Sequence, residues 1–300
     1  MAYQYHTADV FTDDAFGGNQ LAVLPDASGL TEQQMISIAR EFNFSETVFV
    51  FPPDKSIHTR RIRIFTPGAE LPFAGHPTVG TAFVLAATGE IELDGDETRI
   101  VFEEGVGPVP VLIKSRDGKP FFTQLTAAKI PAMLSDSYDV TAIAEILSLQ
   151  VDDIATGSLS IEAWSAGVPF LFVPVRSRDA LARSRVRKEA WERTLENSVA
   201  PEIFVFADEG QKVIRARMFA PTLGISEDPA TGAAVTALGG YLAKRSSSRD
   251  GTLRYSVHQG VEMGRPSLLE LEIDVAASDV KAVRVGGASV LVSSGTLHVV

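Results

Sequence analysis

Residues 63–82 read RIFTPGAELPFAGHPTVGTA, and residues 217–234 read RMFAPTLGISEDPATGAA. Both stretches contain Arg-x-Phe-x-Pro, then a loop with glycine, then a polar residue followed by Pro-x-x-Gly-x-Ala; the polar residue is His76 in the first and Asp228 in the second. The copies lie 154 residues apart at Phe65 and Phe219 and 152 apart at the prolines after His76 and Asp228, about half of the chain. A repeat of this spacing predicts two similar lobes, each with a strand, a tight loop and a helix N-terminus.

The composition is that of a globular protein with two domains. The chain has 300 residues, 45% of them hydrophobic, and a single core rarely grows beyond about 250–300 residues. The net charge of −11 argues against nucleic acid or an acidic membrane surface as partner, because both require a basic face. The absence of cysteine excludes disulfides and thiol catalysis, including racemases that use one cysteine in each lobe. Since we find no secretory signal and no apolar run of membrane-spanning length, we expect a cytoplasmic protein.

Strand patterns outnumber helix patterns along the chain. Strands are predicted at 3–11, 21–24, 46–51, 57–65, 98–103, 108–114, 161–164, 168–175, 202–207, 212–219, 252–259, 267–273, 281–285, 289–293 and 296–300. Helices are predicted at 32–42 (capped by Thr31), 77–87, 140–149, 188–196 and 229–244. Because the strands run in groups, the sequence predicts an α+β fold with mostly antiparallel pairing. The expected lobes are residues 1–118 and 119–288, and the final strands, 289–300, could rejoin the first lobe.

The two loops of the repeat are the first candidate site. Proline suits the first position of a helix, so His76 and Asp228 are predicted as N-caps. Asp228 is a good cap and could be nothing more, whereas His76 caps poorly and is as readily a structural histidine as a functional one. Gly75 is expected to take a backbone conformation closed to other residues. Both helix starts would present free amides that suit a carboxylate or a developing enolate oxygen.

Glu46 is the candidate acid/base group. It begins an apolar strand, where partial desolvation would raise its pKa; the alternative is an ordinary surface glutamate. Glu227 is a second carboxylate, expected to point toward solvent. The five histidines lack metal-ligand spacing, and no dinucleotide loop, P-loop or nucleophile elbow is present, so we expect no metal.

Five motifs together resemble the phenazine-biosynthesis PhzF family. In the family's order, and over most of the chain, they are Asp9-Val10-Phe11-Thr12, Phe16-Gly17-Gly18-Asn19, Asn43-Phe44-Ser45-Glu46-Thr47, Phe73-Ala74-Gly75-His76-Pro77-Thr78 and Glu227-Asp228-Pro229-Ala230-Thr231-Gly232. The resemblance implies the diaminopimelate-epimerase-like fold, with two similar lobes that are each a mostly antiparallel barrel-like sheet around a central helix, and an active site between them. It also implies an isomerase without a cofactor, often homodimeric, acting on a small anionic substrate.

The same resemblance assigns roles to individual residues. Glu46 matches the glutamate that moves a proton on a dihydro-hydroxyanthranilate ring. Gly75, His76, Asp228 and Gly232 match residues that bind or polarise the substrate.

The chain departs from the family pattern at two positions. Ala233 stands where Ser is common, which removes one hydroxyl contact, and Gln20 stands where Pro usually follows Gly-Asn. Ala233 therefore puts the phenazine precursor in doubt as substrate and supports an alternative hypothesis, a non-catalytic protein that binds small anions on the same scaffold.

Overall fold

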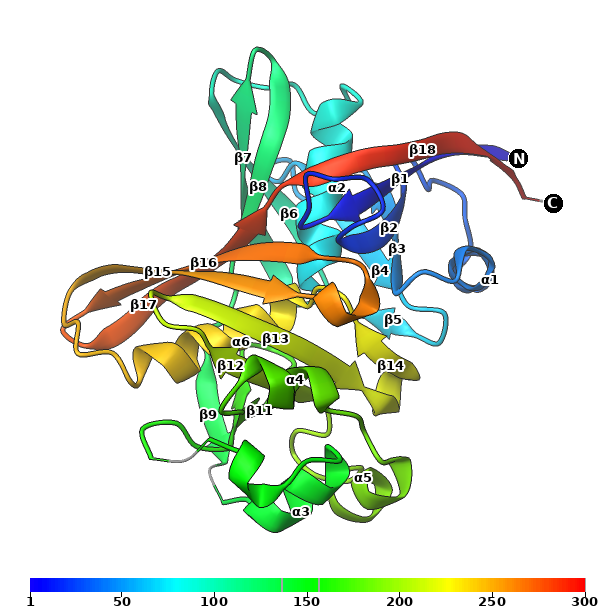
Figure 1. The fold of residues 1–300 in the computed structure, drawn as a ribbon. Helices are drawn as coiled ribbons and strands as arrows, with labels where there is room; N and C mark the ends of the chain where they lie inside the picture. Colours follow the sequence, from blue (N-terminus) through cyan, green and yellow to red (C-terminus); the bar gives the residue numbers. More distant parts are fainter. Residues whose placement is uncertain (136, 156, 300) are drawn as a thin grey trace. The chain divides into compact units, whose positions relative to one another are not determined.

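The computed structural model describes residues 1–135, 137–155 and 157–299. The chain divides into two compact units, Met1–Ala128 together with Val285–Val300, and Lys129–Arg284 (Figure 1). This division differs from the expected boundary after residue 118, because β8 (Lys119–Thr126) pairs antiparallel with β7 (Gly107–Arg116) and so stays in unit 1. The chain re-enters unit 1 at Val285, earlier than the expected residue 289.

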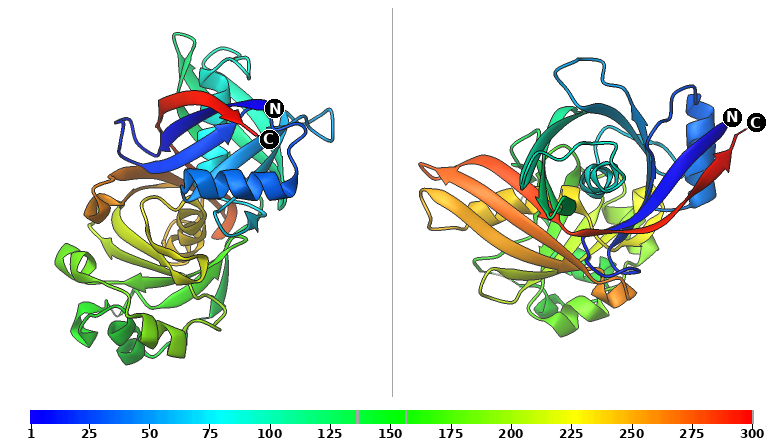
Figure 2. Two further views of the ribbon diagram at one scale, coloured as in Figure 1. Left: turned by 90° about the vertical axis from the view of Figure 1, so that its right-hand side faces the viewer. Right: turned by 90° about the horizontal axis from the view of Figure 1, so that it is seen from above.

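Unit 1 is a curved sheet that surrounds one helix. Its other strands are β1 (Ala2–Val10), β2 (Asn19–Leu24), β3 (Glu46–Phe51), β4 (Arg60–Phe65), β5 (Glu70–Leu71), β6 (Glu97–Glu104) and β18 (Ser289–His298). Among the pairings described for this unit, β2–β3 and β4–β6 are parallel, and β18 pairs antiparallel with β1. Seen from above, the strands encircle α2 (Gly75–Ala87), while α1 (Glu32–Phe42) lies outside (Figure 2).

Unit 2 repeats this topology strand for strand. Its elements are β9 (Ala132–Ser135), α3 (Val140–Ile146), β10 (Glu162–Ser165), β11 (Pro169–Pro174), α4 (Arg178–Arg183), α5 (Lys188–Thr194), β12 (Ile203–Asp208), β13 (Val213–Ala220), β14 (Ile225–Asp228), α6 (Gly232–Ala243), β15 (Gly251–Gln259), β16 (Ser267–Ala276) and β17 (Asp279–Gly287), with 3-10 turns at Val151–Asp153, Pro221–Leu223 and Val261–Met263. Here too two parallel pairs, β11–β12 and β13–β15, interrupt an otherwise antiparallel order. The predicted α+β fold of two similar lobes is therefore confirmed.

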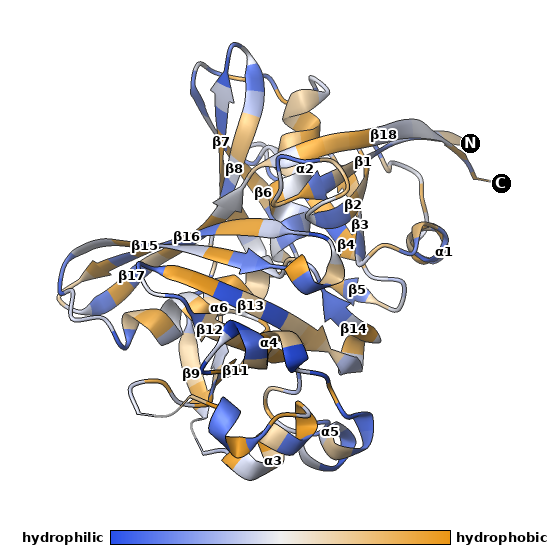
Figure 3. Cartoon of the chain, viewed as in Figure 1, coloured by the Kyte–Doolittle hydropathy of each residue, from blue (hydrophilic) through white to orange (hydrophobic). Residues whose placement is uncertain are grey.

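The central helix of each unit is buried on nearly every side. Helix α2 has twelve buried residues in thirteen, which is why its sequence is apolar or small all round instead of amphipathic. Its C-terminal half is coloured as hydrophobic in Figure 3. A Cβ at Gly80 would lie 2.5 Å from Val10 Cγ2 and 2.6 Å from Leu21 Cδ2, so glycine is what allows α2 to approach β1 and β2.

Several elements differ from their predicted bounds. Helix α3 ends at Ile146 instead of residue 149, and one strand, β18, replaces the two predicted at 289–293 and 296–300. Helix α4, strand β8 and the short strands β5, β9 and β14 were not predicted. Helix α1 has its predicted bounds, with Thr31 in a capping box. Within the described residues, no helix is long and apolar enough to cross a membrane.

Candidate active site

Two of the predicted site residues meet in unit 1. Glu46 is the first residue of β3 and His76 the second of α2, and 3.4 Å separates Glu46 Oε2 from His76 Nε2. Both are buried, with 8% and 3% of their surface exposed. Gly75 immediately precedes His76 as the first helical residue, so the structure places these three predicted residues together.

The predicted helix start was wrong by two residues. The N-cap of α2 is Ala74, whose carbonyl accepts from the Thr78 amide at 3.3 Å, and His76 lies inside the first turn. Pro77 is tolerated there because the first amides of a helix have no intrahelical partner. Gly75 is helical and is not among the residues with positive φ, so its expected special conformation is absent.

Burial favours the neutral form of the His76 imidazole. Burial lowers its pKa to about 3, and a hydrogen bond with the Gln20 backbone opposes this only in part. The amide nitrogen of Asn19 lies 3.2 Å from His76 Nδ1, and an amide nitrogen can only donate. When Nδ1 accepts from Asn19, the ring proton resides on Nε2, which lies 3.4 Å from Glu46 Oε2.

Asn19 was not predicted as a site residue, although it belongs to one of the quoted motifs. The Asp9 carboxylate accepts a hydrogen bond from the Phe16 amide at 2.6 Å and so orders the loop that precedes Asn19. Gly18 has φ of 58°, and a Cβ there would lie 2.3 Å from the Val10 carbonyl oxygen. These two motifs thus build the loop that carries Asn19 to His76.

The second predicted loop belongs to unit 2. Asp228 ends β14 and accepts from Thr231 Oγ1 at 2.5 Å, so it is not the N-cap of α6; Thr231 holds that position. The buried Gln259 side chain braces the loop, donating to the Asp228 carbonyl at 2.7 Å and accepting from the Thr231 amide at 3.1 Å. Gly232 begins α6, and Ala233 is its second residue.

The helix starts change the alignment of the two repeats. Because α2 begins at Gly75 and α6 at Gly232, the counterpart of Gly232 is Gly75, not Gly80. Ala233 then stands where unit 1 has His76.

Glu227 does not point toward solvent as expected. Its carboxylate accepts two hydrogen bonds from Arg217, at 2.8 and 2.7 Å, and the side chain is 15% exposed. Arg63 and Glu70 form the same two-bonded pair in unit 1, at 2.7 and 2.6 Å. The repeated arginine is therefore structural. Because both oxygens of the Glu227 carboxylate accept hydrogen bonds from it, the structure argues against Glu227 as the second candidate acid/base group.

Two buried glutamates were not predicted from the sequence as candidate site residues. Burial raises the pKa of Glu202 to about 7, and its Oε2 has no hydrogen-bond partner. The segments ETVFVF from Glu46 and EIFVFA from Glu202 show that it occupies in unit 2 the position of Glu46, a signal that was readable from the sequence. Burial raises the pKa of Glu104 to about 8.

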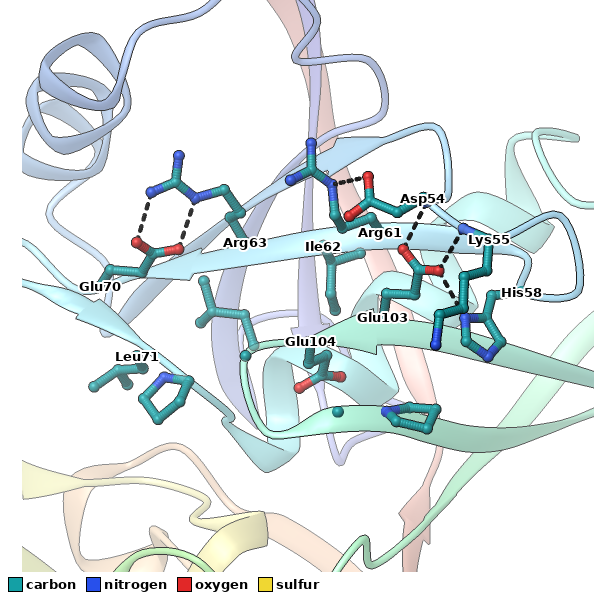
Figure 4. A pocket seen from close by; sticks show the side chains of 15 residues that line it. Asp54, Lys55, His58, Arg61, Ile62, Arg63, Glu70, Leu71, Glu103 and Glu104 are labelled. Carbon is teal, nitrogen blue, oxygen red and sulfur yellow. Dashed lines mark hydrogen bonds and ion pairs between the residues drawn. The ribbon is translucent and has the colours of Figure 1, made fainter.

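Glu104 also lines a pocket of about 600 Å³ in unit 1 (Figure 4). Lys55 and three ion pairs also line it: His58 with Glu103, Arg61 with Asp54, and Arg63 with Glu70. Thr78 is the hydrogen-bond partner of Glu104, at 2.8 Å.

The fold and this pair of loops define the class of protein. The structure is similar to a hydroxyproline epimerase of Agrobacterium vitis, with a TM-score of 0.66, 13% identity and coverage of 99% of this chain and 92% of that one. It is more similar to a PhzF-family protein of Bacillus anthracis, with a TM-score of 0.88, 27% identity and complete coverage of both chains. The epimerase-like fold implied by the sequence is thus confirmed.

The family follows from the sequence comparisons. The model of the phenazine biosynthesis-like proteins, PhzC-PhzF, matches residues 8–295. An uncharacterized isomerase of Mesorhizobium japonicum is 40% identical, covering 98% of each chain, and trans-2,3-dihydro-3-hydroxyanthranilate isomerase of Pseudomonas aeruginosa is 33% identical, covering 99% of each. The chain belongs to this family and is an isomerase.

Proposed function

We propose that this isomerase moves a proton within a small cyclic carboxylate, with Glu46 as the acid/base group. The observation that carries the proposal is the buried contact, at 3.4 Å, between Glu46 Oε2 and Nε2 of the His76 ring, whose low pKa keeps it neutral. A neutral ring does not cancel the charge of the carboxylate beside it, so Glu46 keeps its capacity to accept a proton.

The proposed reaction conserves every atom and electron. Glu46 takes a proton from one ring carbon, and the electron pair of that C–H bond moves into the conjugated system next to the substrate carboxylate. The same carboxyl group then returns the proton at another carbon. The first amides of α2, at Gly75 and His76, have no intrahelical partners and would stabilise the negative charge that develops.

Asp228 and Gly232 stay predictions as substrate-binding residues. Supporting Asp228 is its held conformation: Thr231 donates to its carboxylate, and Gln259 fixes its carbonyl. Ala233, at the position of His76 in the repeat, offers no polar group, so we assign the proton transfer to unit 1.

A deuterium-exchange experiment tests the chemistry. The probe is trans-2,3-dihydro-3-hydroxyanthranilate, the compound in the name of the Pseudomonas relative, incubated in heavy water and followed by proton NMR. We expect the unmodified enzyme to isomerise the probe with solvent deuterium incorporated at carbon. Glu46→Gln should lower the rate by at least about 10²-fold, while the exposed Glu41→Gln in α1 should not change it.

The outcomes separate mechanism from substrate. Turnover by Glu46→Gln at the rate of Glu41→Gln would remove Glu46 from the chemistry. Absence of exchange with the unmodified enzyme would reject this substrate and favour the binding-protein hypothesis if the probe still binds. The homodimer suggested by the family resemblance remains a prediction, which sedimentation velocity would decide.

A further inference from the structure

The start of α2 contains a hydrogen-bond relay that ends on a buried glutamate. Thr78 Oγ1 lies 2.7 Å from the carbonyl oxygen of Ala74 and 2.8 Å from Glu104 Oε1. Ala74 is the N-cap of α2, and the next two residues are Gly75 and His76. A shift of this carbonyl would therefore also displace the adjoining residues Gly75 and His76.

A threonine hydroxyl has only one hydrogen to give. The Ala74 carbonyl is an acceptor only and lies 2.7 Å from Thr78 Oγ1, closer than the 3.3 Å to the Thr78 amide, so it takes the hydroxyl hydrogen. The contact between Thr78 and Glu104 then needs a second hydrogen, which only a protonated Glu104 can supply. An ionised Glu104 would instead compete with Ala74 for the single Thr78 proton.

The surroundings of the carboxyl group agree with a neutral acid. Glu104 is 9% exposed, and its Oε2 is buried without a hydrogen-bond partner. Leaving a carboxylate oxygen unpaired costs far more than leaving the carbonyl oxygen of an acid unpaired. Of the ionisable neighbours around the same pocket, six are engaged in the three pairs described above, and Lys55, on the loop before β4, also lines it.

We propose that Glu104 is a positioning residue that acts as a neutral acid, donating through Thr78 to Ala74 and fixing the helix start that carries His76. The proposal rests on the proposed function for its effect on catalysis, but the protonated relay stands by itself. Burial raises the pKa of this carboxyl to about 8 even though the hydrogen bond with Thr78 acts in the opposite direction, and this supports the proposal. Glu104 is not a catalytic residue, because the relay places Thr78 and Ala74 between it and the His76 turn.

NMR tests the relay without relying on activity. The carbon-13 shift of the Glu104 carboxyl, assigned by its loss in Glu104→Gln, should stay at the value of a protonated acid from about pH 5 to about pH 7. A carboxyl that titrates near the ordinary value of 4.5 would overturn the proposal.

Four variants test the positioning effect on the probe reaction. Glu104→Gln keeps a donor for Thr78 and should retain kcat within about twofold, whereas Glu104→Leu and Thr78→Val should lower kcat about five- to tenfold with little change in KM. The nitrogen-15 shifts of His76 should move in the latter two. Thr81→Val is the matched control: Thr81 lies on the same helix, fully buried, with a hydroxyl that has no hydrogen-bond partner, and its loss should change neither readout.

The results distinguish this inference from the proposed function. If Glu104→Leu leaves kcat and the His76 shifts unchanged, or if Glu104→Gln is as impaired as Glu104→Leu, the positioning role is refuted while Glu46 can remain the acid/base group. If Glu46→Gln retains turnover, the proposed chemistry fails, and the carboxyl and His76 shifts still decide the relay.

Discussion

Replacement of Glu104 by glutamine should remove a pH dependence of stability that is built into unit 1. The pKa of Glu104 is raised from 4.5 to about 8 in the folded protein, so the folded state holds this proton more tightly than the unfolded state. Between these two values the unfolded chain binds fewer protons, and the free energy of unfolding therefore falls as pH rises. Below the lower value, and above the upper one, the contribution of Glu104 no longer changes.

The size of the effect follows from the same two values. A difference between 4.5 and about 8 corresponds to about 5 kcal/mol at about 1.4 kcal/mol per pH unit. Water entry and relaxation around the ionised group reduce this figure, so we expect about 2–3 kcal/mol. The dipole of α2 favours an anion near its first turn by only about 0.3–1 kcal/mol, which does not offset the burial of the carboxylate.

Urea unfolding at about pH 5 and about pH 8.5 measures this difference, with amide hydrogen exchange in α2 to read the unit that carries Glu104. The free energy of unfolding of Glu104→Gln, relative to that of the unmodified protein, should be about 2–3 kcal/mol higher at about pH 8.5 than at about pH 5. Glu41→Gln, at an exposed site, should follow the unmodified protein at both. Parallel stability curves for Glu104→Gln and the unmodified protein would refute the reasoning.

Three further predictions concern the repeat, the helix contact and the histidine. Arg217→Met leaves the Glu227 carboxylate without its partner at a site where the arginine side chain is 3% exposed, and should lower the free energy of unfolding, measured by thermal unfolding, by about 3–5 kcal/mol. Arg63→Met, where the arginine is 23% exposed, should lower it by about 1 kcal/mol or less, and equal losses would contradict this prediction. Gly80→Ala should cost about 1–3 kcal/mol by overpacking against β1 and β2, and an unchanged unfolding midpoint would contradict the contact. The nitrogen-15 shifts of His76 should stay those of a neutral ring from about pH 5 to about pH 8, since its pKa is about 3; titration near 6.5 would contradict its burial.

The sequence predicted the architecture because a single chain shows both the duplicated motif and the alternation of apolar and polar residues that marks strands. The repeated Arg-x-Phe-x-Pro marks equivalent strands, β4 and β13, and the pairing around them is the same in both units. The helix starts were missed because Pro77 is as acceptable at the third helical position as at the first, and Ala74 carries no capping side chain.

Glu104 was missed for a different reason, since its local pattern did contain the signal. Residues 98, 100, 102 and 104 alternate as the buried face of β6, so the strand pattern already placed Glu104 inside. No sequence pattern could show that the hydroxyl of Thr78, far away in the sequence, would donate its one hydrogen bond to the Ala74 carbonyl. The protonation of Glu104 is a consequence of tertiary contact.

The two copies of the repeat share their strand-to-strand contacts and differ at one residue of the proposed site. Arg63 lies over the Phe65 ring and Arg217 over the Phe219 ring, each at 5.0 Å from the ring centre, and each arginine pairs with a glutamate on the next strand. The arginine and glutamate that the copies share thus hold strand to strand. Glu46 also has a counterpart, Glu202, whereas the position of His76 is taken by Ala233 at the second helical position. A duplicated fold can assign proton transfer to one half in this way, because the strand pairs that both halves need do not depend on the residue at that position.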